Sequence, residues 1–424
     1  MSLRRIQIDV TALRESADFR RVFTASTISM MGSWITYVTI PLQVKLITNS
    51  YAAVGLIGLI ELLPMFVFGL IGGAIADTKN RKLIVILTET ALMLATGILF
   101  FNAHFGTNSL FALYAVAFIF AICDAIQRPT LDSLGPVILP TSLLASAGAL
   151  SSLRWTFGAI VGPAIGGFIA ATWGTQYCYA IDIASYGLSI LLLMGLSQKA
   201  TQRTGGTVGF KMVFSGFNYA RSRTDLLGTY VVDIIAMLFA FPNALFPFIA
   251  SEFHAEWALG WLYSAMSIGS FIATSTSGWT KHIHKRGRAV VFAATAWGVA
   301  MMFAGLAPNI YLVLLALVIA GAADMVSGLF RGLIWNTTIP LDMRGRLAGI
   351  EMLSYMSGPQ IGQVRATLVA QWTSLRVSLI SGGIFCALGA GSIGYGIREL
   401  WNFDNRTNEH AIAERIARGE SEDF

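Results

Sequence analysis

The chain has 424 residues, of which 55% are hydrophobic and only 12% are charged, and its formal net charge is +6. An ordinary soluble domain carries about 25% charged residues, so a water-soluble fold of this composition would leave much apolar surface uncovered. The composition therefore excludes a soluble enzyme and predicts a membrane protein with several spans.

Cofactor and metal chemistry have no support in the sequence. Cys123, Cys178 and Cys386 lie inside apolar runs, and only His282 and His284 are histidines close to one another. The chain has no zinc motif and no phosphate-binding loop of the GxxxxGK type. We expect no cofactor, no metal and no enzymatic activity. The positive charge lies in loops, which favours membrane orientation over nucleic-acid binding.

Apolar runs long enough to cross a bilayer follow one another along the chain. A span needs roughly 20 apolar helical residues, and the runs are continuous rather than alternating, which excludes a β-barrel. The twelve predicted spans are 22–47, 52–76, 83–103, 109–138, 143–172, 177–197, 226–250, 257–279, 289–307, 310–338, 347–372 and 376–398.

These runs divide the chain into two halves. We expect six-helix bundles at 22–197 and 226–398, joined by a cytoplasmic linker at 198–225. A polar segment (1–21) precedes them, and an acidic tail (399–424) follows with a short helix whose apolar face holds Ile412 and Ile416. Lys and Arg gather in the N-terminal segment and in the loops after the even-numbered spans, which places both termini in the cytoplasm.

The two halves resemble each other in sequence. Asp124 and Pro140 recur as Asp324 and Pro340, and the Gly162-Pro163 pair of the fifth predicted span recurs at 358–359 in the eleventh. Such a duplication predicts two pseudo-symmetric bundles with a substrate site near the midplane, exposed alternately to each side as one bundle rocks against the other.

Two motifs identify a family resemblance. Residues 72–82, GGAIADTKNRK, resemble motif A of the major facilitator superfamily, with Asn80 at the family's usual glycine. Residues 158–167, GAIVGPAIGG, resemble motif C of its exporters. Within the superfamily, Asp18-Phe19-Arg20 before the first span and Pro41-Leu42-Gln43 inside it are similar to the siderophore-exporter and macrolide-efflux branch. The resemblance implies an all-α membrane fold of twelve helices, working as a monomer in the bacterial inner membrane.

Motif A predicts a gate. A carboxylate where a helix ends can meet the positive end of a neighbouring helix or a cation on it, and such a clasp between the halves would open and close with the cycle. The alternative is a basic loop that only sets orientation. The predicted gate residues are Gly73, Asp77, Lys79, Arg81 and Lys82.

Motif C predicts close helix packing. Gly158, Gly162 and Gly166 share one helix face and permit backbone contact with a neighbouring helix. Pro163 bends the helix, and Gly167 extends the small-residue face.

Ionisable residues inside spans are costly and are functional candidates by default. Asp124 and Arg128 are four residues apart, so they share a helix face and can pair, and loss of the partner would let the acid take a proton. A static buried pair is the alternative. In the family's helix arrangement, the helices that carry Glu89 and Asp182 lie on the outside of the bundle. The resemblance therefore makes these two acids weaker candidates for a functional role. The predicted proton-coupling residues are Asp124, Arg128, Asp233, Asp324 and Glu61.

The expected cavity combines guanidinium groups with aromatic rings. Arginine suits anionic or catecholate groups and stacks on aromatic rings, although these aromatics can also face lipid. The predicted cavity residues are Arg154, Arg331, Arg365, Trp34, Tyr37, Phe241, Trp335 and Tyr355.

Together these features predict a secondary exporter of a bulky organic molecule, driven by protons through alternating access. A catecholate siderophore of the enterobactin type is the expected substrate. A multidrug or macrolide efflux pump is the alternative of the same fold, and a non-transporting sensor or complex subunit is the alternative of another class.

Overall fold

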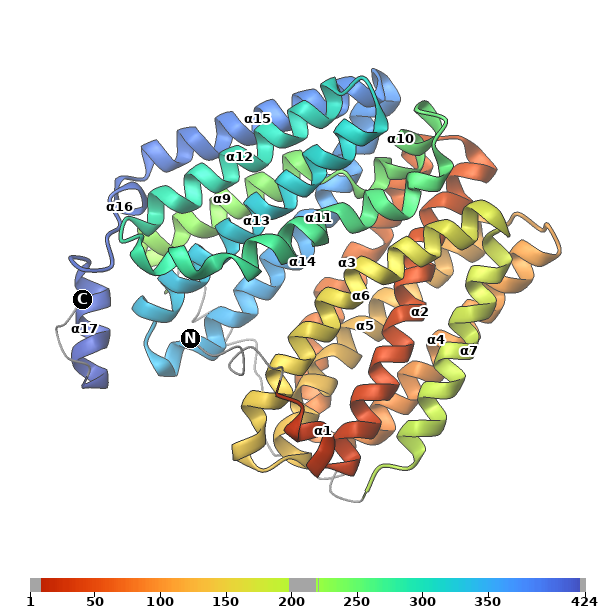
Figure 1. Ribbon diagram of the computed structural model, residues 1–424, viewed down its shortest axis with the longest axis horizontal. Helices are drawn as coiled ribbons and strands as arrows, with labels where there is room; N and C mark the ends of the chain where they lie inside the picture. The colour runs from red at the N-terminus through yellow and green to blue at the C-terminus, as the bar shows by residue number, and fades with distance from the viewer. Residues whose placement is uncertain (1–8, 198–218, 220, 420–424) are drawn as a thin grey trace, which may run out of the picture. The chain divides into compact units, whose positions relative to one another are not determined.

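The computed structural model describes residues 9–197, 219 and 221–419, and it leaves undescribed the side chains at 70–71, 73–74, 76–78, 341–342, 344–346 and 348–356. In the described part of the chain, every regular element is an α-helix or a short 3-10 helix (Figure 1). The predicted all-α fold is confirmed.

The helices of the first half are joined by short turns. Four of them begin at a polar cap of the expected kind; for example, the Asn80 side chain accepts from Leu83 N at 3.1 Å, and Ser109 accepts from Ala112 N. They are α1 (Thr11–Glu15), α2 (Ala17–Thr48), α3 (Tyr51–Thr78), α4 (Arg81–His104), α5 (Leu110–Ile138), α6 (Leu144–Thr172) and α7 (Thr175–Met194).

The second half repeats this series with two additions, a helix break after α9 and a tail of two short helices. Its elements are α9 (Thr224–Ala240), α10 (Phe246–Glu252), α11 (Leu259–Ser275), α12 (Arg286–Leu306), α13 (Ile310–Thr338), α14 (Leu341–Trp372), α15 (Leu375–Gly396), α16 (Arg398–Trp401) and α17 (Glu409–Arg418).

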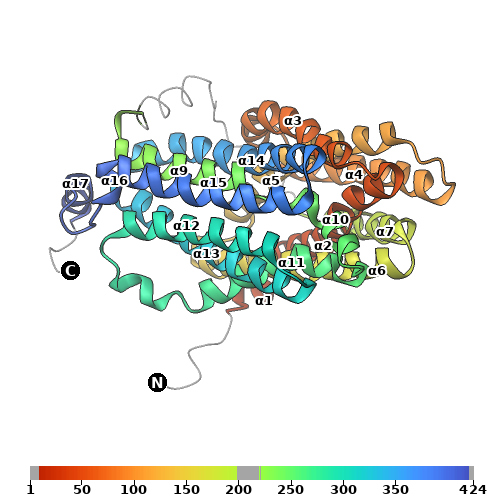
Figure 2. The same cartoon turned by 90° about the horizontal axis from the view of Figure 1, so that it is seen from above.

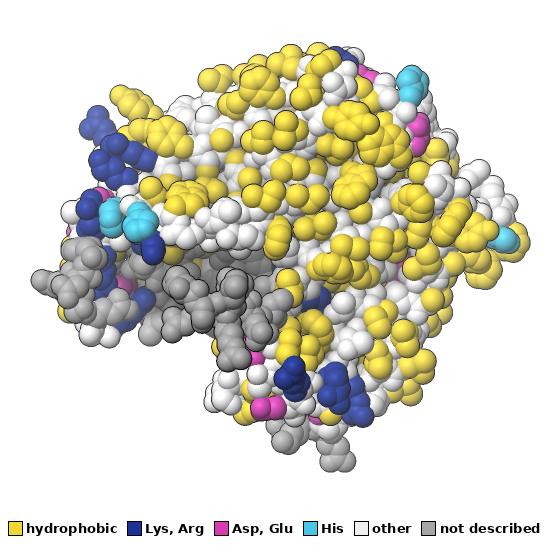
Figure 3. Space-filling view, viewed as in Figure 1, with side chains coloured by type: hydrophobic (Ala, Val, Ile, Leu, Met, Phe, Trp, Pro, Cys, Tyr) yellow, Lys and Arg dark blue, Asp and Glu magenta, His cyan; other side chains and the backbone are white. Residues whose placement is uncertain are grey.

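Each predicted span contains a helix, and nine segments of the described residues are long and apolar enough to cross a membrane. The remaining three spans correspond to α2, α11 and α14. Helix α11 has only 17 residues, and α2 carries buried polar side chains such as Thr36 and Gln43 that lower its hydropathy. Figure 3 shows hydrophobic side chains over most of the visible surface, with charged groups toward its edges. The protein is a multi-span membrane protein.

Two predicted spans are not single helices. The run 226–250 is interrupted after Ala240, where Phe241 is extended before Pro242 and a 3-10 turn leads into α10. Proline disfavours helical geometry in the residue before it and has no N–H to donate, so the predicted span is present as Thr224–Glu252 but contains a helix break. Helix α11 likewise ends at Ser275, and a 3-10 helix follows.

The described helices form two compact units. Of the described residues, unit 1 holds 9–49, 60–197 and 256–264, and unit 2 holds 50–59, 219, 221–255 and 265–419. The start of α3 thus belongs to unit 2 and the start of α11 to unit 1. The sequence predicts a division only at the linker and does not predict this exchange of segments.

The two units share one pattern of neighbours. In unit 1, α2 packs on α6 and α7, and α4 packs on α5 and α7. In unit 2, α9 packs on α14 and α15, and α12 packs on α13 and α15 (Figures 1 and 2). Helices in corresponding chain positions therefore have corresponding partners, as the sequence repeat predicts.

The predicted tail helix is α17, with Asn408 as its N-cap and Gly419 at its C-terminus. Its buried residue is Ala411, whereas Ile416 is 72% exposed. The tail packs on the end of α13, where Arg418 donates to the Asn336 carbonyl at 3.0 Å.

Candidate functional site

The first group of candidate residues lies on α5 in unit 1. Asp124, Arg128 and Asp132 follow one another at four-residue intervals, so they share one face of the helix. Asp124 and Asp132 are exposed side chains, and Arg128 is half-buried. Arg128 interacts electrostatically with both acids. Sequence reasoning missed Asp132, although its spacing from Arg128 repeats that of Asp124.

Helix α6 contributes a cation and a tryptophan to this group. Arg154 is half-buried, interacts electrostatically with Asp132, and its buried Nε atom has no hydrogen-bond partner. The neighbouring Trp155 ring lies under the Arg128 guanidinium, with 5.0 Å between the Arg128 Cζ and the ring centroid. A guanidinium over a tryptophan face is a favourable cation–π arrangement. We call Asp124, Arg128, Asp132, Arg154 and Trp155 the unit 1 charged group.

A line of aromatic rings continues from Trp155 along α2. Trp155 meets Trp34 edge-to-face at 6.2 Å, Trp34 meets Tyr37 at 5.4 Å, and Tyr37 meets Tyr263 at 5.8 Å. Trp34 and Tyr37 are half-buried, and Trp155 is 40% exposed. The predicted cavity residues Trp34 and Tyr37 are thus brought next to the charged group, and Trp155 and Tyr263 are additions that the sequence did not single out.

The motif C glycines determine how closely α2 approaches α6. A Cβ at Gly162 would lie 2.5 Å from Trp34 Cβ, and one at Gly166 would lie 2.9 Å from Ile35 Cα. Gly158 faces Met30 and Trp34, while Gly167 lies against the backbone of Gly260. These close approaches place Trp34 directly over the small face of α6.

In unit 2, the corresponding charged residues are paired. Arg331 on α13 bonds Asp233 on α9 at 2.5 Å, and the two side chains are only 12% and 9% exposed. Asp324, two turns before Arg331 on α13, interacts electrostatically with both. Three residues predicted from isolated positions therefore form one group, which we call the unit 2 charged group.

The indole ring of Trp335, a predicted cavity residue, contacts other residues of unit 2. Its indole Nε1 donates to Thr229 Oγ1 at 2.9 Å, and its ring stacks on Tyr230 at 5.0 Å. Both partners belong to α9. Trp335 thus packs against the buried cluster of this unit, and its substrate role stays a prediction.

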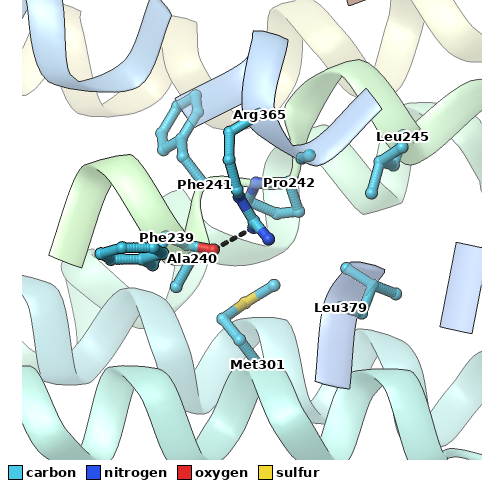
Figure 4. A pocket seen from close by; sticks show the side chains of 9 residues that line it. Phe239, Ala240, Phe241, Pro242, Leu245, Met301, Arg365 and Leu379 are labelled. Carbon is cyan, nitrogen blue, oxygen red and sulfur yellow. Dashed lines mark hydrogen bonds between the residues drawn. The ribbon is translucent and has the colours of Figure 1, made fainter. Parts of the chain in front are cut away.

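Arg365 on α14 lies at the break of α9 (Figure 4). Its guanidinium donates to the Phe239 carbonyl and, at 3.4 Å, to the Ser378 carbonyl. The break at Pro242 leaves the last carbonyls of α9 without helical donors, and Arg365 supplies a charged one. Phe241 lines the same small pocket as Arg365. These contacts are those of a helix cap; a substrate role for Arg365 and Phe241 stays a prediction.

The basic residues of motif A are engaged within unit 1. Arg81 is buried and donates to Ser133 Oγ at 2.9 Å, and Lys82 donates to the Met194 and Leu196 carbonyls at the end of α7. Lys79 is exposed. The backbone of Gly73 and Asp77 is helical, but their side-chain positions lie outside the described residues, so the predicted clasp stays a prediction.

Two further candidates are less defined. Glu61 is half-buried on α3, and the Tyr355 side chain lies outside the described residues. Among the residues that the structure describes, no group of three or more His, Cys, Asp or Glu side chains is arranged to hold a metal ion.

The fold and the two charged groups define a membrane transporter built from two related sets of helices. The chain belongs to the transmembrane secretion effector family of the major facilitator superfamily, whose model matches residues 10–415.

Among curated proteins, the chain is similar to the enterobactin exporter EntS of Shigella boydii serotype 18 and of Escherichia coli O1:K1. Each is 26% identical over 84% of this chain and 86% of the relative. Among solved structures, it resembles a bacterial homologue of the iron transporter ferroportin, with 14% identity over 94% of this chain and 99% of the other, and a TM-score of 0.71. A bacterial homologue of the lysosomal transporter Spinster gives the same TM-score and identity, over 91% of this chain and 98% of the other. The structural likenesses show the fold alone.

Proposed function

We propose that the chain exports a bulky, aromatic, partly anionic organic molecule, with a catecholate siderophore of the enterobactin type as its substrate. The observation that carries this proposal is the unit 1 charged group with its line of aromatic rings. Arg128 and Arg154 present cationic groups beside Trp155 and Trp34. Guanidinium groups match anionic oxygens, and flat rings match catechol rings. The similarity to the enterobactin exporters supports the same substrate class.

Protons are the proposed driving ion. Asp124 is exposed and interacts electrostatically with Arg128, so a carboxylate there is favoured while the guanidinium is near. Movement of Arg128 toward a bound anionic substrate would weaken that interaction and favour proton uptake by Asp124. We further propose that the chain works as a monomer in the bacterial inner membrane with both termini in the cytoplasm, following the distribution of Lys and Arg.

Export from intact cells tests the proposal. Iron-starved cells that lack their own siderophore exporters and drug pumps would carry the chain, and enterobactin in the medium would be measured beside growth inhibition by macrolides and dyes. We expect restored enterobactin release. Drug resistance without enterobactin release would instead indicate a multidrug pump, and neither effect in correctly inserted protein would indicate a non-transporting role.

A tryptophan pair on α6 serves as the matched test of the site. Trp155→Ala removes the ring under Arg128, whereas Trp173→Ala removes a 61% exposed ring at the other end of the same helix. We expect Trp155→Ala to reduce enterobactin release and Trp173→Ala to leave it near that of the unaltered protein. Equal release from both variants would contradict the placement of the substrate at the unit 1 charged group.

A further inference from the structure

Two acids on helices that the family resemblance places outside the cavity are among the most buried polar groups of unit 1. Glu89 on α4 is 2% exposed, and Asp182 on α7 is 0% exposed. Both lie against α2, whose Ser29 and Thr36 contact the two acids and whose Ser33 bonds Tyr186 of α7. We call the two acids and these three hydroxyl residues, with Thr96, Ser185 and Ser189, the acid cluster.

Asp182 is surrounded by hydroxyl donors. Thr36 Oγ1 donates to its Oδ2 at 2.5 Å, Thr96 Oγ1 donates to the same oxygen at 3.4 Å, and Ser185 Oγ donates to Oδ1 at 3.3 Å. Three donors from three different helices are the environment that a carboxylate needs when no cation is near. Asp182 is therefore equipped to carry a negative charge.

Glu89 is surrounded differently. Gln127 Nε2 on α5 donates to its Oε1 at 2.8 Å, but the buried Oε2 has no hydrogen-bond partner. The Ser189 hydroxyl, which faces Glu89 from α7, is also buried without a partner. Rotation of the Ser189 hydroxyl can pair it with Glu89 Oε2 in either protonation state, because a hydroxyl accepts from a protonated carboxyl and donates to an ionised one. The surroundings of Glu89 can therefore adapt to the binding and the release of a proton.

Among the described residues, no cation lies beside the acid cluster to balance two ionised carboxylates. The titratable side chains that face it are Cys178, Tyr179 and Tyr186 from α7 and Cys123 from α5, with Asp124 beyond on α5. Helix α2 faces it with hydroxyls, and no Lys or Arg is among the described partners of either acid. Two ionised carboxylates buried in a membrane protein without a cation would be prohibitively costly, so the cluster must hold at least one proton.

The two acids lie along one polar line. Thr96 meets Asp182, and Glu89, seven residues earlier on α4, faces Ser189, seven residues later on α7. Seven residues of helix correspond to about 10 Å. Ser33 Oγ on α2 and Tyr186 OH on α7 are 2.8 Å apart, and Tyr186 lies between Asp182 and Ser189 along α7. The two acids are thus separate sites, with a bonded pair of hydroxyl groups at the level between them.

We propose that Glu89 binds and releases a proton during the transport cycle and that Asp182 is the second acid of the same proton site. Helix α2 contributes hydroxyl groups to the acid cluster and two rings to the aromatic line, so a change of charge at Glu89 acts on the helix that presents Trp34 and Tyr37. Gln127 holds Glu89 from α5, one turn from Asp124. The inference rests on the proposed function for its coupling to export, but the proton on Glu89 is independent of the substrate.

The test uses the full chain in lipid vesicles with enterobactin as the probe. Glu89→Gln has the shape of the protonated acid and cannot titrate. We expect it to keep enterobactin exchange across the membrane without a gradient and to lose accumulation driven by a pH gradient. Asp182→Asn should weaken the same accumulation, whereas Thr90→Ala, which removes a hydroxyl that donates to the Ile86 carbonyl of its own helix and lies outside the acid cluster, should retain it. Gradient-driven accumulation by Glu89→Gln at the rate of the unaltered protein would overturn the proposal.

Infrared spectroscopy separates this inference from the proposed function. The unaltered protein should show a protonated-carboxyl band that is missing in Glu89→Gln, whether or not enterobactin is transported. Absence of that band difference at neutral pH would overturn the proposal. If the band is present but enterobactin exchange is absent in the unaltered protein, the substrate assignment fails while the proton site stands. In Ser189→Ala, the protonated-carboxyl band should remain but shift in position or fall in intensity. This result would support a proton on Glu89 Oε2, because the substitution removes the hydroxyl beside that atom.

Discussion

The charged groups of the two units occupy related positions on related helices, yet they are built differently. In unit 2, Asp233 and Arg331 bond each other and are nearly excluded from solvent. In unit 1, Arg128 lies over the Trp155 ring, and the acids before and after it on α5 are exposed. The duplicated scaffold therefore pairs an acid and a cation directly in unit 2, whereas in unit 1 the cation lies over an aromatic ring and the acids beside it are exposed.

The glycine faces show the opposite trend, since they are alike in both units. Gly162 lies against Trp34 of α2, and Gly358 and Gly362 lie against Met237 of α9. The fifth helix of each series thus approaches the first helix of its own unit through small residues. The comparison teaches that backbone packing was retained after duplication while the side chains around it diverged.

The largest expected effect comes from breaking the ion pair of unit 2. Arg331→Met leaves Asp233 buried without its cation, and loss of one partner of a buried pair costs about 3–5 kcal/mol. In unit 1, Asp124→Asn changes an exposed side chain and should shift the free energy of unfolding by no more than about 0.5 kcal/mol. Thermal unfolding in detergent compares the two variants. Equal melting temperatures would remove the distinction between the charged groups.

A smaller effect is expected from filling the glycine face of unit 1. Gly167→Ala places a methyl group against the backbone of Gly260, and overpacking of this kind costs about 1–3 kcal/mol. Gly97→Ala on α4 is the matched control, because a Cβ there meets nothing within 4 Å. Its better helix propensity should make it neutral or slightly stabilising. A Gly167→Ala protein as stable as the control would show that the face tolerates a wider helix separation.

The stacked guanidinium of unit 1 gives a third, weaker prediction. Arg128→Lys keeps the charge but loses the planar group over Trp155. A cation–π contact contributes about 0.5–1 kcal/mol at an accessible site, which corresponds to about two- to fivefold weaker binding. Enterobactin affinity measured by tryptophan fluorescence tests this. Unchanged affinity would place the substrate away from the stacked pair.

The smallest effect concerns the C-terminal tail of unit 2. A hydrogen bond from Arg406 lowers the pKa of Asp404 from its ordinary 3.8 to about 2. Because the folded-state pKa is depressed, the stabilisation is complete above about pH 4 and is lost as the pH falls through 2. Melting temperatures of the unaltered protein should therefore fall more steeply between pH 4 and pH 2 than those of Asp404→Asn. If the melting temperatures of the two proteins changed with pH in parallel, Arg406 would lower the pKa of Asp404 equally in the folded and the unfolded chain.

Some departures from the predicted elements had a visible signal in the sequence. Phe241-Pro242 breaks α9 because proline rejects helical geometry before it, and this dipeptide was present inside the predicted span. Asp132 also had a signal, its spacing of four residues from Arg128. The capping role of Arg365 had none, since its acceptor Phe239 is 126 residues away along the chain.

The acids show the same limit more clearly. Glu89 and Asp182 were predicted to be less important because of the helices that carry them. Their partners Gln127 and Thr36 lie 38 and 146 residues away. No local pattern brings such residues together, and only the packing of α2, α4, α5 and α7 determines that both acids are buried among hydroxyl and amide groups.

The sequence by itself determined the membrane class, the order of the spans, the internal repeat and the small faces of the fifth and eleventh spans. Each depends on composition, length or spacing within a short stretch, and those are local properties. Only the tertiary structure decided which charges are paired and which are exposed. A helix that is apolar on most sides carries little information about the face it turns to its neighbours, so the partners of Asp233, Arg128 and Glu89 were fixed by how the helices pack.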